Sequence, residues 1–181
     1  MIEFFESRLD LQRPGTVGGN LKLKPEWKTD TEIGFGDEND DDPWIYTDFV
    51  YPCIDEYKTK HPYIDTIDQW EVDSHYKMQR YRPGEGYHKL HCENEGMNPD
   101  GSYRRLLAWM VYLNDVTDGG HTEFPAQKKK FQPRRGDILI WPAYWTHPHR
   151  GVVSKTQVKY ILTGWSIFIG DPCKDVKNCI N

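Results

Sequence analysis

Three side chains of this sequence have the types and spacing of a metal site. His91 and Glu93 stand two positions apart, and a second imidazole follows much later, at His147 or His149. If the first pair lies on a strand, both side chains point to the same face. Two imidazoles and one carboxylate on one side of a metal, with the other positions open, are the ligands of mononuclear non-heme Fe(II) sites. The sequence therefore predicts an iron site of this kind.

Other histidines compete for the same role. His88, three positions before the first imidazole, would face away from the carboxylate if the strand already runs there. His121 follows a glycine turn and is a further candidate. His147 and His149 share a strand face, so face alone does not separate them.

A lysine inside an apolar strand is the second chemical feature. Lys159 stands in the run from Val158 to Trp165, and a cation placed there needs an anionic partner. The dicarboxylate 2-oxoglutarate would supply one. Thr163 shares the strand face of this lysine and adds a hydroxyl on the same side. The alternative is an edge lysine that extends to water, and the apolar neighbours of Lys159 argue against it.

Six short motifs then occur in the order and at the spacing of a known family. They are Tyr81-x-x-Gly84, His91-x-Glu93, Tyr112-Leu113-Asn114, Gly119-Gly120-x-Thr122-x-Phe124-Pro125, Arg135-Gly136-Asp137, and His149 with Lys159. With them the sequence resembles the Fe(II)/2-oxoglutarate-dependent dioxygenases, in particular the prolyl 4-hydroxylase branch, over roughly residues 76 to 168. One His-x-Glu match is weak, but six ordered motifs are a strong signal. The family usually has Asp where this chain has Glu93, which keeps the charge and adds one methylene.

The resemblance implies a ligand set for the metal. Fe(II) would be held by His91, Glu93 and His149, because the ten-residue step from His149 to Lys159 matches prolyl 4-hydroxylases. His147 would need a step of twelve, so it would be a supporting or structural residue. In the family pattern, the position of His121 shapes the pocket without binding metal.

The resemblance also implies a cosubstrate site. 2-Oxoglutarate would chelate the metal through its 2-oxo acid end and reach Lys159, Tyr112 and Thr163 with its far carboxylate. Tyr81 would border the same pocket. The alternative for both tyrosines is an ordinary place in the core.

The reaction that the resemblance implies is oxidative. O2 and 2-oxoglutarate would be consumed, succinate and CO2 released, and an unactivated C–H bond hydroxylated, with ascorbate in support. The metal centre would carry the chemistry, so no acid–base residue is required and none is named. The expected substrate is a peptide or protein hydroxylated on a prolyl residue. Aromatic residues before the second imidazole, at Trp141, Tyr144 and Trp145, would suit an extended proline-containing segment.

Other functions stay open at this point. An oxygenase of the same fold could act on a free amino acid, another small molecule or a nucleobase. A non-catalytic, metal-binding jelly roll would need no cosubstrate cation, so Lys159 argues against it. A zinc hydrolase can use the same ligand types, but no general base is evident nearby.

The elements that must position these residues are mainly strands. About seven or eight short strands with turn residues between them are expected from residue 76 to residue 168, which favours a sandwich or jelly roll. A helix is expected from Asp42-Pro43, with a kink or break at Pro52 and an end at His61-Pro62. Helices between residues 43 and 70 would cover one sheet. The predicted class is mainly β with flanking helices (α+β), and the resemblance implies a double-stranded β-helix.

The length of 181 residues fits one domain. We expect an N-terminal segment with supporting helices at 1–75, a jelly-roll core at 76–168 and a tail at 169–181. Residues 21–24 alternate and could form a short edge strand. The acidic run at 36–42 is typical of a solvated loop.

The composition excludes several classes. A net charge of −5 does not favour a nucleic-acid surface. No apolar run could span a membrane and the start of the chain lacks the pattern of a signal peptide, so a cytoplasmic location is expected. The four cysteines, at 53, 92, 173 and 179, should then be mostly thiols, although Cys173 and Cys179 could pair. Nothing in the sequence indicates an oligomeric state.

Overall fold

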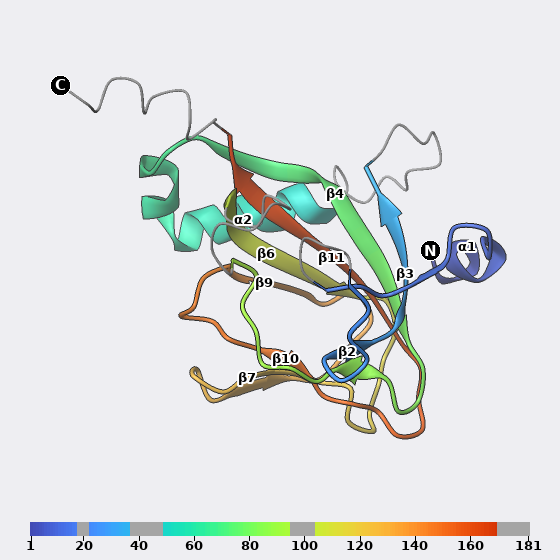
Figure 1. The fold of residues 1–181 in the computed structure, drawn as a ribbon. Helices are drawn as coiled ribbons and strands as arrows, with labels where there is room; N and C mark the ends of the chain where they lie inside the picture. Colours follow the sequence, from blue (N-terminus) through green and yellow to red (C-terminus); the bar gives the residue numbers. More distant parts are fainter. Residues whose placement is uncertain (18–21, 37–48, 95–103, 170–181) are drawn as a thin grey trace.

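The structure is a computed structural model that describes residues 1–17, 22–36, 49–94 and 104–169. Its main element is a six-stranded antiparallel sheet in the order β1-β3-β4-β11-β6-β9 (Figure 1). The strands are β1 (Arg13–Pro14), β3 (Thr31–Phe35), β4 (Trp70–Tyr81), β6 (Arg105–Tyr112), β9 (Ile138–Pro142) and β11 (Lys159–Phe168).

Two small sheets complete the β structure. One has the order β10-β7-β8, formed by β7 (Thr122–Phe124), β8 (Lys129–Phe131) and β10 (Arg150–Gly151). The other pairs β2 (Lys28–Thr29) with β5 (Gly86–Tyr87). In Figure 1, the small sheets lie toward one side of the large sheet and α2 (Tyr51–Lys60) toward the other. The class is therefore mainly β with flanking helices, as predicted.

The sequence of β6 explains why the large sheet is buried on both faces. Almost every residue of this strand is apolar, and successive side chains point to opposite faces. One set packs into the core that also contains Val50 and Ile54, beside and within α2: Leu107, Trp109 and Val111. The other set packs into a second core on the opposite face: Ala108, Met110 and Tyr112. β6 is thus one of the strands expected between residues 76 and 168, and it is buried on both faces.

The neighbouring strands β4 and β11 present polar side chains on the face of the sheet opposite α2. Their register pairs Lys159 with Tyr81, and Thr163 with Lys77. These residues all line one cavity, together with Gln79 of β4. The predicted common face of Lys159 and Thr163 is therefore confirmed, and the two strands bring an unusual set of polar groups to an otherwise apolar face.

The helices differ in part from the expectation. The first helix, α1 (Ile2–Ser7), was not predicted. The helix expected from residue 42 falls partly outside the described residues, since 37–48 are not described. Within α2, Pro52 stands in the first turn and makes no internal kink. The helix ends at His61 as predicted, and the short 3-10 helix η2 (Pro62–Thr66) follows. No helix among the described residues is long and apolar enough to cross a membrane.

The N-terminal strands are the main correction. The edge strand expected at 21–24 is wrong for its described residues, because Lys22 forms only an isolated bridge with Val17. Instead, β1 and β3 extend the large sheet beyond β4. From β4 to β11 there are eight strands among the described residues, in agreement with the seven or eight expected. The division of the chain at residues 75 and 168 stays a prediction, and β4 runs across the first of these boundaries.

Several expectations fall outside the described residues. They concern the acidic run, described only at residue 36, the tail from 170 onward, and the pairing of Cys173 with Cys179. Cys53 is a free thiol, as expected, and Sγ of Cys92 donates to the carbonyl of Asn94 at 3.3 Å.

Candidate active site

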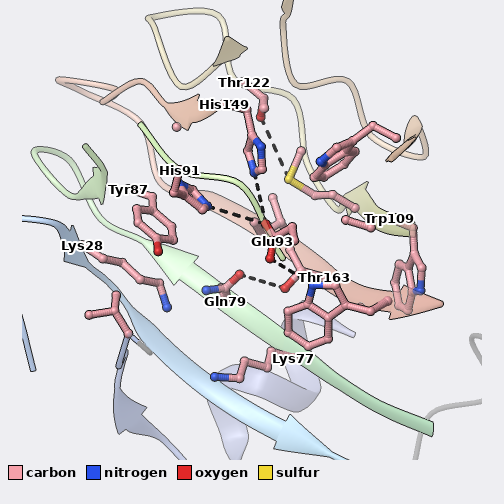
Figure 2. Close-up of a pocket in the computed structure, with 18 of the residues that line it drawn as sticks. Lys28, Lys77, Gln79, Tyr87, His91, Glu93, Trp109, Thr122, His149 and Thr163 are labelled. Carbon is pink, nitrogen blue, oxygen red and sulfur yellow. Dashed lines mark hydrogen bonds and ion pairs between the residues drawn. The ribbon is translucent and has the colours of Figure 1, made fainter. Parts of the chain in front are cut away.

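The structure brings the three predicted metal ligands together. His91, Glu93 and His149 each offer one ligand atom, and these atoms all lie within 4.8 Å of one another. They line a cavity of about 460 Å³ on the face of the large sheet opposite α2. Figure 2 shows both imidazoles pointing toward the glutamate. The cluster contains His149 and not His147.

The main chain holds the two histidines beside each other. The N–H of His91 donates to the carbonyl of His149 (3.0 Å), and the N–H of His149 donates to the carbonyl of His91 (2.8 Å). The strand expected to align His91 with Glu93 is not formed, because β5 ends at Tyr87 and only this isolated bridge follows. The side chains converge because Glu93 and Asn94 are anchored separately, through hydrogen bonds from their N–H groups to the carbonyl of Ala143.

Each imidazole is oriented by a carbonyl two residues before it. Nδ1 of His91 lies 3.0 Å from the oxygen of Lys89, and Nδ1 of His149 lies 3.1 Å from the oxygen of His147. A carbonyl oxygen only accepts, so we assign the ring proton to Nδ1 in both residues. In the neutral rings, both Nε2 lone pairs then face the cavity, which is the tautomer that a metal requires.

These lone pairs meet a carboxylate. Oε1 of Glu93 lies 3.1 Å from Nε2 of His149 and 3.6 Å from Nε2 of His91. Lone pairs on three facing atoms repel unless a proton or a metal ion lies among them. Donors about 2.1 Å from one metal, at right angles to each other, are about 3 Å apart. The donor set therefore fits a divalent cation such as Fe(II).

Aromatic rings hold both imidazoles in place. His91 stacks on Tyr87 with ring centroids 3.7 Å apart. His149 stacks on Phe124 at 5.2 Å and meets the edge of Trp141 at 5.0 Å. Both histidines are buried, so their rotamers are restricted before any ligand arrives.

The second oxygen of Glu93 has a different environment. Oε2 accepts a hydrogen bond from Nε1 of Trp165 (3.0 Å) and lies 3.6 Å from Nη1 of Arg105. Burial opposes ionisation of Glu93, but when a proton lies between Oε1 and the imidazoles of His149 and His91, their hydrogen bonds and charge outweigh burial and hold the pKa of Glu93 well below the usual range. The carboxyl group offered to a metal is therefore an anion at neutral pH.

Lys159 is a buried cation on the same cavity. Its Nζ donates to the carbonyl of Gly120 (3.1 Å) and lies 4.6 Å from the ring centre of Tyr81. Gly119 and Gly120 both have positive φ angles, 69° and 68°, which turn this carbonyl toward the lysine. Among the described residues, no carboxylate lies within ion-pair distance of Lys159. Burial accordingly lowers its pKa from 10.5 to about 8.

The remaining predicted cosubstrate residues divide into two groups. Thr163 and Tyr81 line the cavity. The hydroxyl of Thr163 donates to Oε1 of Gln79 (3.1 Å), as Figure 2 shows. Tyr112 is not among the lining residues, and its hydroxyl lies 2.7 Å from Oγ1 of Thr122 and 3.1 Å from the carbonyl of Phe131. Contact of Tyr112 with 2-oxoglutarate therefore stays a prediction that this arrangement does not favour.

The competing histidines stay outside the cluster. His88 is exposed, and its Nε2 lies 3.5 Å from Oγ1 of Thr29. His121 is half-buried, and burial lowers its pKa. His147 contributes its carbonyl to His149 and is otherwise bonded to Thr146.

One wall of the cavity is formed by residues that the sequence did not indicate as part of a site. Lys28 of β2 and Lys77 of β4 line it, and both are paired with Glu32 of β3 at 2.9 Å. Lys28 also pairs with the fully buried Asp30 at 2.9 Å, which accepts from Gln79 at 2.8 Å. Lys28, Asp30 and Glu32 stand at alternate positions of the chain, but no local pattern in the sequence indicated that this segment would pair with β4.

The fold and the site together define a class of protein. Residues 76–167 match the 2OG-Fe(II) oxygenase superfamily, and all three predicted metal ligands and Lys159 lie inside this stretch. The chain belongs to this superfamily, whose cofactor and cosubstrate are Fe(II) and 2-oxoglutarate.

Solved structures of prolyl hydroxylases are similar to the chain in fold. The viral collagen prolyl hydroxylase of Paramecium bursaria Chlorella virus 1, solved with 2-oxoglutarate, has a TM-score of 0.57 and 22% identity, over 78% of this chain and 80% of that one. A Trichoplax adhaerens prolyl hydroxylase was solved in complex with a peptide from the oxygen degradation domain of hypoxia inducible factor. It has a TM-score of 0.67 and 17% identity, over 92% of this chain and 74% of that one. These likenesses confirm the double-stranded β-helix.

A curated relative points to the same branch. It is a protein of Acanthamoeba polyphaga mimivirus, provisionally named prolyl 4-hydroxylase, and it is 30% identical over 103 residues. The match covers 49% of this chain and 43% of the relative, so the chain spans less than half of that protein.

Proposed function

We propose that this protein is an Fe(II)- and 2-oxoglutarate-dependent oxygenase that hydroxylates an unactivated C–H bond, with prolyl residues of a peptide or protein as its substrate. One observation carries the proposal. A single cavity joins three metal donors to a buried cation, Lys159, that has no carboxylate partner among the described residues. A ligand with an oxo acid at one end and a carboxylate at the other satisfies both.

The metal would be held by His91, Glu93 and His149. When bound, Fe(II) with 2-oxoglutarate and O2 supplies the oxidation, in which 2-oxoglutarate becomes succinate and CO2 and a substrate C–H becomes C–OH. The chain itself orients the groups that take part. Two histidine rings are fixed through their Nδ1 atoms, and the glutamate through Oε2. Such preorganisation reduces the freedom that the ligands lose when the metal binds.

Lys159 would bind the far carboxylate of the cosubstrate. Its ammonium donates to Gly120, and its two other protons are available to an oxygen anion. Gly151 lies beside it, since a Cβ at that position would be in ordinary contact with Nζ at 3.6 Å. Thr163 presents a hydroxyl on the same strand, where Gln79 holds it. Burial among Tyr81 and Ile161 limits competition from water for the ion pair.

The prolyl substrate is supported by the relatives and by the aromatic residues near His149. The viral and Trichoplax proteins are prolyl hydroxylases, and the second binds a peptide. Trp141 lines the cavity, whereas Trp145 is 80% exposed four residues before the ligand. An exposed indole close in sequence to a residue of the cavity suits an extended, proline-containing segment, because such a segment loses little entropy on docking. Tyr144 packs instead against the core on the helix side.

The test has two stages. Anaerobic calorimetry should first show 2-oxoglutarate binding that depends on Fe(II). Incubation with O2, ascorbate and a panel of proline-containing peptides should then release succinate and add one oxygen to proline, detected by mass spectrometry. The variant His91→Ala should show neither. Oxidation confined to free amino acids, other small molecules or nucleobases would overturn the prolyl substrate, and a lack of succinate release with every substrate would overturn the oxygenase.

A further inference from the structure

The two oxygens of Glu93 are held by opposite kinds of group. Oε1 faces the imidazole nitrogens of His91 and His149, and it is the atom that a metal would bind. Oε2 accepts from Nε1 of Trp165 at 3.0 Å and lies 3.6 Å from Nη1 of Arg105. Both donors come from the large sheet, Trp165 from β11 and Arg105 from the first position of β6.

Arg105 and Trp165 act as one unit. The guanidinium carbon of Arg105 lies 3.7 Å from the ring centre of Trp165, which is a close cation–π contact. The same Nη1 also donates to the main-chain carbonyl of Glu93 at 3.1 Å. The arginine therefore fixes both the backbone and the carboxylate of the glutamate, and the indole under it supplies the shorter bond to Oε2. We call these two residues the Glu93 clamp.

From this arrangement we propose that the Glu93 clamp restricts Glu93 to metal binding through one oxygen. The inference rests on the proposed function. A carboxylate can bind a metal through one oxygen or both, and its terminal torsion is broad. With three protein donors, a six-coordinate ion keeps three positions, of which 2-oxoglutarate takes two and O2 one. A second oxygen of Glu93 would remove one of them.

The length of the glutamate side chain makes such a restriction necessary. Glu93 has one more methylene than the aspartate that the family usually carries, and therefore one more torsion through which both oxygens could approach the ion. In this structure Oε2 instead accepts a hydrogen bond from Trp165 and forms an ion pair with Arg105, while Oε1 faces the histidines. The clamp residues are thus positioning residues that keep a cosubstrate position free.

The test uses the Co(II)-loaded protein, because the visible spectrum of Co(II) reports its coordination number. Trp165→Phe removes the indole N–H and keeps a ring under the guanidinium, and Arg105→Met removes the charge. Matched controls are Trp70→Phe, which loses an N–H bonded to the carbonyl of Ile64, and Arg104→Met, which loses bonds to the carbonyl of Phe168. For each variant we would measure the Kd of Co(II), the Kd of 2-oxoglutarate on the loaded protein, and the spectrum before and after 2-oxoglutarate.

The clamp variants should bind Co(II) within about threefold of wild type, or more tightly, and should have an altered Co(II) spectrum. Their Kd for 2-oxoglutarate should rise about tenfold or more, since a hydrogen bond to a charged group is lost. The controls should match wild type in all three measurements. The folding of each clamp variant is checked by circular dichroism. If one of the two does not fold, the other still tests the proposal.

Two results would overturn the inference. One is a Co(II) Kd raised more than tenfold while saturated protein binds 2-oxoglutarate normally, which would make the clamp a support for metal affinity alone. The other is no change in either affinity or in the spectrum. Failure of the proposed function is distinguishable, because wild-type protein would then bind no 2-oxoglutarate on the metal, and the inference would fall with it.

Discussion

Replacing the buried cation is the sharpest test of the cosubstrate site. Lys159→Met keeps a linear side chain of similar volume and removes the charge. The structure gives the magnitude. Burial lowers the pKa of Lys159 from 10.5 to about 8, which corresponds to about 3 kcal/mol of lost stabilisation of the charged form. A bound carboxylate that restores the usual pKa recovers this amount, and about 3 kcal/mol is roughly 100-fold in Kd. We therefore expect the Kd of 2-oxoglutarate to rise roughly 100-fold.

The assay is anaerobic calorimetry of 2-oxoglutarate with the metal-loaded protein, and the Kd of the metal itself should stay nearly unchanged. Lys155→Met is the control, because Lys155 is exposed in the turn before β11. Thermal stability should not fall in Lys159→Met, since replacing a poorly compensated buried charge by an apolar group is often neutral or stabilising. An unchanged Kd for 2-oxoglutarate in a folded Lys159→Met variant would refute the reasoning. Lys159→Arg is a poor control, because a planar guanidinium differs in shape from an ammonium.

Three further expectations follow from other contacts. His149→Ala should abolish Fe(II) binding in calorimetry, whereas His147→Ala should retain it because only the main-chain carbonyl of that residue is used; the reverse pattern would contradict the ligand assignment. The affinity for 2-oxoglutarate should be constant below about pH 8 and fall as the pH rises above it, since Lys159 loses its proton there, and a flat profile in calorimetry from pH 7 to 9.5 would exclude this dependence. Gly164→Ala should lower Tm by roughly 5 °C or more, because a Cβ would lie 2.1 Å from a buried tryptophan ring, whereas Gly34→Ala, with nothing within 4 Å, should leave Tm unchanged.

Much of the fold could be predicted because the central strands carry strong local patterns. The apolar run of β6 and the alternation of β4 and β11 are visible without any partner strand. The strands β1 and β2 are two residues long each, too short for a periodic pattern. They and β3 form because they pair with segments distant in the sequence, such as β4 and β5, and a local pattern carries no such information.

The sequence indicated which three side chains come together at the cavity, but only part of what supports them. The spacing of His91 to Glu93, and of His149 to Lys159, is a short-range feature that a sequence displays directly. The reason given for the first pair was nevertheless wrong in part, because a bridge replaces the expected strand. Trp165 was visible only as the end of the apolar run that contains Lys159, and nothing in the sequence indicated that it would contact Glu93. Arg105 gave no signal, because a cation at the edge of an apolar run is usually a surface residue.

The three ligands differ in how easily point mutation can disturb them. The rings of His91 and His149 are oriented through carbonyl oxygens, and no substitution at Lys89 or His147 removes a carbonyl. Glu93 is oriented by two side chains, and each can be changed by a single codon. The hydrogen bonds that orient the two imidazoles therefore survive any side-chain substitution, although the aromatic rings packed against them do not, whereas both contacts that orient the carboxylate can be lost by substitution. Substitution of the two side chains that hold Glu93 would change how its carboxylate binds a metal and would leave the hydrogen bonds of the histidine rings intact.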